Sequence, residues 1–79
     1  MDVKILGTGC ANCRALEDAT REAVEAAGTD ADVEKVEEMD EIVGYGVLGL
    51  PALVVDGEVV LAGRVPAVEE LAEMLAARA

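Results

Sequence analysis

Two cysteines, Cys10 and Cys13, are the only thiols in this 79-residue chain, and two residues separate them. They lie in the stretch GTGCANCR, directly after a short apolar run and a glycine-rich loop. Thiols at this spacing can form a dithiol–disulfide couple, supply two ligands to a soft metal ion, or pack as small buried side chains. The residues around the pair help to choose among these three interpretations.

The helix expected behind the pair favours redox chemistry. Cys10 stands at the start of a predicted helix, and Cys13 lies one turn inside it. The first N–H groups of a helix are unpaired and its dipole is positive there, so the pKa of a cysteine in such a motif falls to roughly 3.5–7.5. Cys13 also shares an apolar stripe with Leu16. This pattern predicts an exposed nucleophilic Cys10 and a shielded, resolving Cys13.

A metal site is the main alternative. A closed zinc site needs four ligands, whereas this chain offers two cysteines and no histidine. Copper(I) held by two thiolates stays open, because soft thiolates suit that ion. Copper carriers that use a CxxC have a methionine two residues before the first cysteine, where this chain has Thr8. We therefore predict no resident metal or cofactor and keep copper(I) handling as the second hypothesis.

Composition indicates a single domain over residues 1–79. The net charge of −11 repels phosphate backbones and anionic lipid, so nucleic-acid binding is not expected. No apolar run approaches the roughly 18 residues of a membrane span, and the N-terminus has no basic, hydrophobic leader. We therefore expect a cytoplasmic protein without membrane contact, in which a CxxC pair is more often reactive than structural.

The first half of the chain alternates strand and helix patterns. Residues 3–6 read as a strand, residues 11–27 as an amphipathic helix and residues 32–36 as a second strand. Gly28 stands where the cap of the long helix is expected. A short helix is predicted over residues 38–44.

The second half predicts a hairpin and a last helix. Residues 50–55 and 58–62 are apolar, β-branched runs on either side of Asp56-Gly57, which is a strong hairpin signal. Pro66 is expected to begin the last helix. The order is β-α-β-α-β-β-α, which predicts an α/β fold with a four-stranded mixed sheet and helices on both faces.

This series of motifs resembles the small archaeal and bacterial thioredoxin-like proteins, also called redox-active disulfide proteins. The resemblance extends from Val3 to Leu75 and rests on GTGCANC before a helix, LP before a strand, the DG hairpin and GRV before the last helix. It implies a thioredoxin fold without the first strand and helix of ordinary thioredoxin. It also implies thiol–disulfide exchange with Cys10 as nucleophile and Cys13 as resolving thiol.

The resemblance further implies substrate-binding residues. Only about 5–6% of X–Pro bonds are cis, so the residues alone favour a trans Leu50–Pro51 bond, whereas the family implies a cis Pro51 facing the disulfide. The backbone of Leu50 is then expected to pair with an extended target segment. Gly63 resembles the glycine that keeps the surface beside the disulfide open, and a plain turn glycine explains it equally well.

Two departures from thioredoxin proper concern the surroundings of the thiols. Thioredoxin has tryptophan before its first cysteine and Gly-Pro between the pair, where this chain has Gly9 and Ala11-Asn12. Thioredoxin also has a buried acid six residues before the first cysteine, and Lys4 stands at that position. Proton handling is therefore expected to differ, through water or Glu34, and no general base is assigned.

The sequence thus predicts a monomeric, cytoplasmic thiol–disulfide oxidoreductase. It is expected to carry electrons between a flavin-dependent thioredoxin reductase and disulfide-bearing protein substrates. A third interpretation is a non-catalytic module that binds peptide near Pro51, and it ranks last because the chain retains both cysteines.

Overall fold

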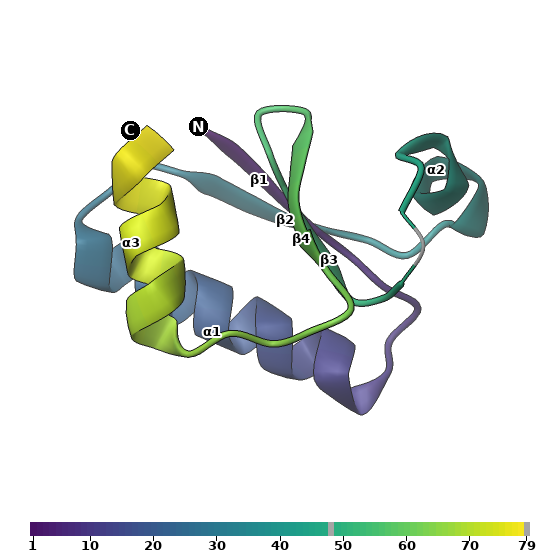
Figure 1. Cartoon of the computed structure of the whole chain (residues 1–79), viewed down its shortest axis with the longest axis horizontal. Helices are drawn as coiled ribbons and strands as arrows, with labels where there is room; N and C mark the ends of the chain where they lie inside the picture. The colour runs from purple at the N-terminus through teal and green to yellow at the C-terminus, as the bar shows by residue number, and fades with distance from the viewer. Residues whose placement is uncertain (48, 79) are drawn as a thin grey trace.

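Four strands form one mixed sheet in the computed structural model of the chain, which describes residues 1–47 and 49–78 (Figure 1). Across the sheet the strand order is β2-β1-β3-β4, with β1 and β2 parallel and the other neighbours antiparallel. The predicted α/β class and element order are confirmed. Along the chain the elements are β1 (Asp2–Leu6), α1 (Ala11–Ala27), β2 (Asp32–Val36), α2 (Met39–Gly44), β3 (Ala52–Val55), β4 (Glu58–Ala62) and α3 (Val68–Arg78).

Helices cover both faces of the sheet, as the sequence predicts. On one face, Leu16 of α1 and Leu71 of α3 belong to a buried cluster with Ile5 of β1. On the other face, Ile42 of α2 belongs to a second cluster with Leu6 of β1. Neighbouring residues of β1 divide between the clusters because successive side chains of a strand point to opposite faces. Figure 1 shows α1 and α3 together, with α2 apart from them.

Two turns close as their residue types require. Gly28 follows α1 with a φ of 64° and donates its N–H to the Glu25 carbonyl, which satisfies a carbonyl at the helix end. Asp56 and Gly57 have φ values of 50° and 84°, the backbone of the tight turn that joins antiparallel strands. The Asp56 carboxylate also accepts the Asp2 N–H at 2.8 Å, so the turn is tied to the start of β1.

The two outer strands of the sheet are β2 and β4. On β2, Glu34 and Lys35 are exposed to solvent. On β4, Val59 pairs with Val54 and Leu61 pairs with Leu53, so Val60 is an extra residue and forms a bulge. Neither edge is therefore a regular, apolar strand.

Two predicted boundaries are wrong by two residues. The strand expected from Leu50 begins at Ala52, because Pro51 has no N–H to donate to the sheet. The helix expected from Pro66 begins at Val68. Ala67 accepts the hydrogen bond of the Leu71 N–H at 3.1 Å, so the first helical bond starts after the proline.

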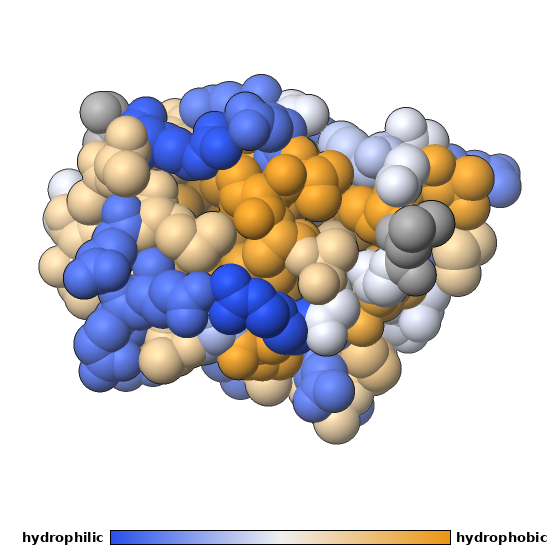
Figure 2. Space-filling model, in the orientation of Figure 1, coloured by the Kyte–Doolittle hydropathy of each residue, from blue (hydrophilic) through white to orange (hydrophobic). Residues whose placement is uncertain are grey.

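The surface is divided between apolar and charged areas. Figure 2 shows apolar residues over the centre of the viewed face, where β4 lies, with hydrophilic residues along both sides. Met39 and Val43 of α2 and Val65 after β4 are large apolar side chains that remain exposed. Within the described residues, none of the helices is long and apolar enough to cross a membrane.

Candidate active site

Cys10 and Cys13 form a disulfide at the N-terminus of α1, with their Cα atoms 5.0 Å apart. Cys10 is the N-cap of the helix and Cys13 lies in its first turn. The two cysteines differ in access, because Cys10 is exposed while Cys13 is only 6% exposed. The structure thus joins the two predicted redox cysteines, with Cys10 at the surface and Cys13 buried beneath it.

The start of α1 is arranged to accept negative charge at Cys10. The Cys10 sulfur accepts the backbone N–H of Cys13 at 3.1 Å, and the Cys10 carbonyl accepts the N–H of Arg14 at 3.1 Å. The first turn of the described helix holds no acidic side chain. The positive end of the helix dipole is therefore not offset by a carboxylate within the first turn of α1, and it stabilises a thiolate when the disulfide is reduced.

Three loops meet at the end of the sheet that carries the disulfide. In the sheet, Leu6 of β1 pairs with Ala52 of β3, and Ala52 pairs with Ala62 of β4. The cysteine loop follows Leu6, Leu50-Pro51 precedes Ala52, and Gly63 follows Ala62. All three segments therefore lie at the same end of the strands (Figure 1). The structure brings the predicted catalytic and substrate-binding residues to this end of the sheet: Cys10, Cys13, Leu50, Pro51 and Gly63.

The Leu50–Pro51 peptide bond is cis, in agreement with the family resemblance. Pro51 is buried, Leu50 is partly exposed, and the Pro51 carbonyl accepts the Gly63 N–H at 2.8 Å. Gly63 has a φ of 80°, which favours glycine, and no described atom lies within 4 Å of the position of a Cβ there. Both explanations of Gly63, a turn glycine and a glycine that keeps the surface beside the disulfide open, therefore agree with the structure.

Lys4 and Glu34 lie on the face of the sheet opposite Cys13. The two residues pair across β1 and β2, two positions before Leu6 and Val36, which belong to the cluster around α2. Interaction with the Tyr45 side chain raises the pKa of Lys4. Lys4, which stands six residues before Cys10 where thioredoxin has its buried acid, therefore points its side chain away from the disulfide.

A small cavity of about 20 Å³ adjoins Cys13 on the α1 face, and it is large enough for about one water molecule. From the sheet, Ile5 and Lys35 line it, and Glu37 lines it just past β2. The Lys35 Nζ atom lies 4.0 Å from Glu37 Oε1 and 3.8 Å from Glu17 Oε1. Glu37, which the sequence analysis did not select, is thus the carboxylate that shares this cavity with Cys13.

The described residues do not form a metal site of three or more ligands. No group of three or more His, Cys, Asp or Glu side chains is placed to hold an ion in residues 1–47 and 49–78. Copper(I) handling by Cys10 and Cys13 needs two thiolates only. It stays a prediction that these observations do not test.

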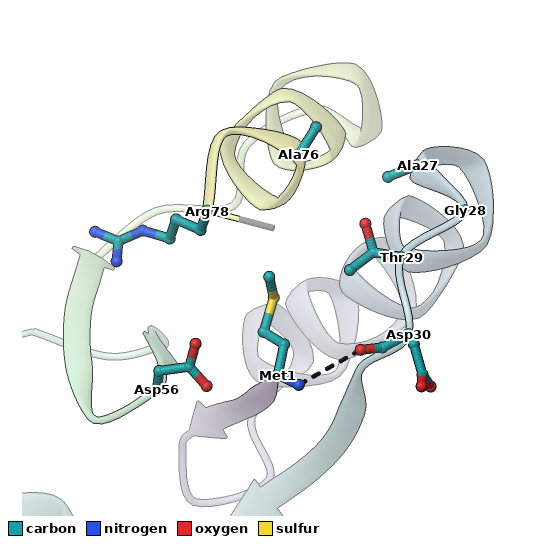
Figure 3. Close-up of a pocket in the computed structure, with 8 residues that line it drawn as sticks. All are labelled: Met1, Ala27, Gly28, Thr29, Asp30, Asp56, Ala76 and Arg78. Atoms are coloured by element: carbon teal, nitrogen blue, oxygen red, sulfur yellow. Dashed lines mark hydrogen bonds between the residues drawn. The ribbon is translucent and has the colours of Figure 1, made fainter.

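A second hollow, of about 720 Å³, lies far from the cysteines (Figure 3). It is lined by the last residue of α1, Ala27, and by Met1 and Arg78. The 17 residues of α1 place the hollow about 25 Å from the cysteine end. Two of its charged groups have partners: Arg78 pairs with Glu58, and the terminal ammonium of Met1 donates to the backbone carbonyl of Asp30. It has no part in the chemistry of the disulfide.

Comparison with known proteins agrees with this geometry. A family model described as a thioredoxin domain matches residues 1–76. This chain belongs to the thioredoxin family. A thioredoxin from Methanothermobacter thermautotrophicus is 51% identical over 75 residues, which cover 95% of this chain and 97% of the relative. A thioredoxin from Methanocaldococcus jannaschii is 37% identical over 73 residues, which cover 92% and 84% of the two chains.

Membership of the thioredoxin family, together with the disulfide at the helix N-terminus, defines the activity. The protein is a thiol–disulfide oxidoreductase that uses its CxxC pair. As in the thioredoxin family generally, its substrates are proteins that carry disulfides, and a reductase returns it to the dithiol form.

Proposed function

We propose that Cys10 attacks the target disulfide and that Cys13 resolves the mixed disulfide. The observation that carries this assignment is the contrast in access: Cys10 is exposed, while Cys13 is 6% exposed. A disulfide within another protein can approach the outer sulfur directly, whereas the inner sulfur can reach only its own neighbour. The helix N-terminus also stabilises the attacking thiolate at Cys10.

The exchange balances as follows. The Cys10 thiolate attacks one target sulfur, the target S–S bond breaks, and the second target sulfur leaves as a thiolate that takes a proton from solvent. Cys13 then loses its proton and attacks the Cys10 sulfur. The bond between Cys10 and the target breaks, and the target is released as a dithiol. Two electrons pass from this protein to the target.

The neighbouring loops supply the docking surface in this proposal. An extended target segment runs beside Leu50, whose backbone precedes β3 at the disulfide end of the sheet, and pairs with it as an added strand does. Pro51 is buried beneath this segment, and the open space at Gly63 admits the target chain.

The physiological role follows from the same chemistry. We propose that the chain works in the cytoplasm as a monomeric single domain of residues 1–79. A flavin-dependent thioredoxin reductase keeps it reduced, and it passes the electrons to protein disulfides. The curated relatives named thioredoxin, which it matches over more than nine-tenths of its length, support this role.

Insulin reduction by dithiothreitol tests the assignment of the two thiols. We expect wild type to accelerate insulin precipitation, Cys10→Ser to abolish the acceleration, and Cys13→Ser to accumulate a covalent mixed disulfide visible by mass spectrometry. Gly44→Ala, at the end of α2 with no described atom within 4 Å of the new methyl group, is the matched control and should behave as wild type. Equal activity of Cys10→Ser and wild type would contradict the proposal.

A coupled assay tests the reductase. Oxidised protein is mixed with NADPH and a purified flavin-dependent thioredoxin reductase, and NADPH consumption is followed. We expect turnover with wild type and none with Cys10→Ser. Failure of the flavoprotein to reduce wild type, in a preparation that reduces insulin with dithiothreitol, would reject this partner while leaving the thiol assignment intact.

A further inference from the structure

Gly7 occupies an unusual position at the end of β1. It is buried, and its N–H donates to the Val36 carbonyl of β2 at 3.0 Å, so its backbone continues the hydrogen bonding of the sheet. Gly9, two residues later, has a φ of 86° and needs glycine for its backbone, but Gly7 is not among the glycines with positive φ. The backbone conformation therefore gives no reason for glycine at position 7.

The reason lies in the resolving cysteine. A Cβ atom at position 7 would clash with the Cys13 sulfur and would stand 2.8 Å from the Cys13 Cβ. The Cys13 side chain thus rests directly on the Gly7 backbone, in the space that any other residue would fill. Such an overlap is far inside the separation of about 3.5–4.0 Å that carbon atoms prefer.

Neither partner has freedom to retreat while the disulfide is closed. Gly7 is held by its bond to Val36, next to a strand that pairs on both sides. Cys13 is held by its covalent bond to Cys10, and Leu16, one turn further along α1, is fully buried in the core. A side chain at position 7 must displace either the end of β1 or the start of α1.

The disulfide and the dithiol differ in how well they accommodate a side chain at position 7. In the disulfide, the Cys13 sulfur is fixed by its bond to the Cys10 sulfur. In the dithiol, that bond is absent, and the Cys13 sulfur can turn to another staggered rotamer away from position 7, while the Cys13 Cβ atom stays in place in both states. A methyl group at position 7 therefore destabilises both states through the Cys13 Cβ atom, and it destabilises the disulfide further through the sulfur.

We propose that Gly7 is a positioning residue for the redox reaction. Its missing side chain provides the seat for the Cys13 sulfur and thereby sets the stability of the disulfide relative to the dithiol. This inference rests on the thiol–disulfide exchange of Cys10 and Cys13, in which the disulfide gains two electrons and two protons to become the dithiol. The identity of the reductase and of the targets does not enter it.

A redox equilibrium with glutathione tests the proposal. Gly7→Ala and wild type are equilibrated with mixtures of glutathione and glutathione disulfide, acid-quenched, and counted as dithiol or disulfide by mass spectrometry after thiol alkylation. We expect Gly7→Ala to favour the dithiol by at least about tenfold, which corresponds to a potential about 30 mV less negative. Gly44→Ala should match wild type, because its methyl group meets no described atom within 4 Å.

This readout separates positioning from a purely structural role. A general loss of packing would destabilise both redox states equally and leave the glutathione equilibrium unchanged. An equilibrium constant of Gly7→Ala within about twofold of wild type, or a shift toward the disulfide, would overturn the proposal. Insulin reduction by wild type is measured separately, so failure of the exchange function and failure of the Gly7 inference give different results.

A double-mutant cycle covers the case in which Gly7→Ala folds poorly. The unfolding equilibrium is measured under reducing conditions for Gly7→Ala in the wild-type background and in Cys13→Gly, which removes the two side-chain atoms that the new methyl group would meet too closely. We expect Gly7→Ala to cost at least about tenfold less in the unfolding constant when residue 13 is glycine. Equal cost in both backgrounds would show that the Cys13 side chain is not what position 7 accommodates.

Discussion

Cys10 has a second task, as the N-cap of α1, and this task can be separated from its chemistry. Its sulfur accepts the Cys13 N–H at 3.1 Å, which satisfies one of the unpaired donors at the helix start. Cys10→Ser keeps a side-chain acceptor at this position and Cys10→Ala removes it. Both variants lack the Cys10 thiol, so any difference between them reports the cap alone.

The expected magnitude follows from the size of the domain. Loss of an N-cap acceptor costs about 1 kcal/mol. Unfolding of 79 residues has an entropy of about 2.1 cal/mol/K per residue, so this loss lowers the melting temperature by about 6 °C. Cys10→Ser is expected to melt near reduced wild type, and Cys10→Ala about 6 °C lower.

The measurement is thermal unfolding by circular dichroism, with every protein kept reduced so that no disulfide contributes. Thr8→Ala, a change at an exposed residue of the same loop, serves as control and should melt with wild type. If Cys10→Ala and Cys10→Ser melt within about 1 °C of each other, the Cys10 sulfur does not cap the helix. The argument that the helix start is organised around Cys10 would then fail.

Two further predictions concern stability. Leu16→Ala leaves a cavity where a fully buried side chain packs between α1 and the sheet, so it should cost about 3 kcal/mol in urea unfolding; a cost below about 1 kcal/mol would contradict the packing described. Arg78 lowers the pKa of Glu58 through their hydrogen bond, with Asp56 also near the guanidinium. This stabilisation exists above the unfolded pKa near 4.5 and is lost as the pH falls through the lowered folded value. The melting temperatures of Arg78→Gln and wild type should therefore differ at pH 7 and converge toward about pH 2, and a gap that persists in acid would contradict the pairing.

The elements of the fold were predictable because their signals are local. The stripe of α1, the cap at Gly28 and the turn at Asp56-Gly57 all depend on residues close together in sequence, and the structure confirms each one. The start of β3 was missed because the apolar run continues through Leu50 and Pro51, where the ladder cannot yet form. Hydrophobic pattern does not record which backbone N–H groups are available.

The site was predictable in its cysteines and less so in their surroundings. Cys10 and Cys13 identify themselves by type and spacing. Gly7 looked like an ordinary loop glycine, because its contact with Cys13 exists only when β1 and α1 come together. Glu37 could have been found from the alternation of side chains along β2, which places Lys35 on the Cys13 side of the sheet and Glu34 on the other.

The irregular outer strands have a consequence for association. An outer strand with free N–H and carbonyl groups is a template on which another chain can build, and regular, apolar edges lead to aggregates. Here one edge carries exposed charge on β2 and the other is interrupted by the bulge at Val60 on β4. Both features discourage growth of the sheet sideways. In the docking mode that we propose, a target strand pairs with the loop at Leu50, beside the disulfide, rather than with either outer strand of the sheet.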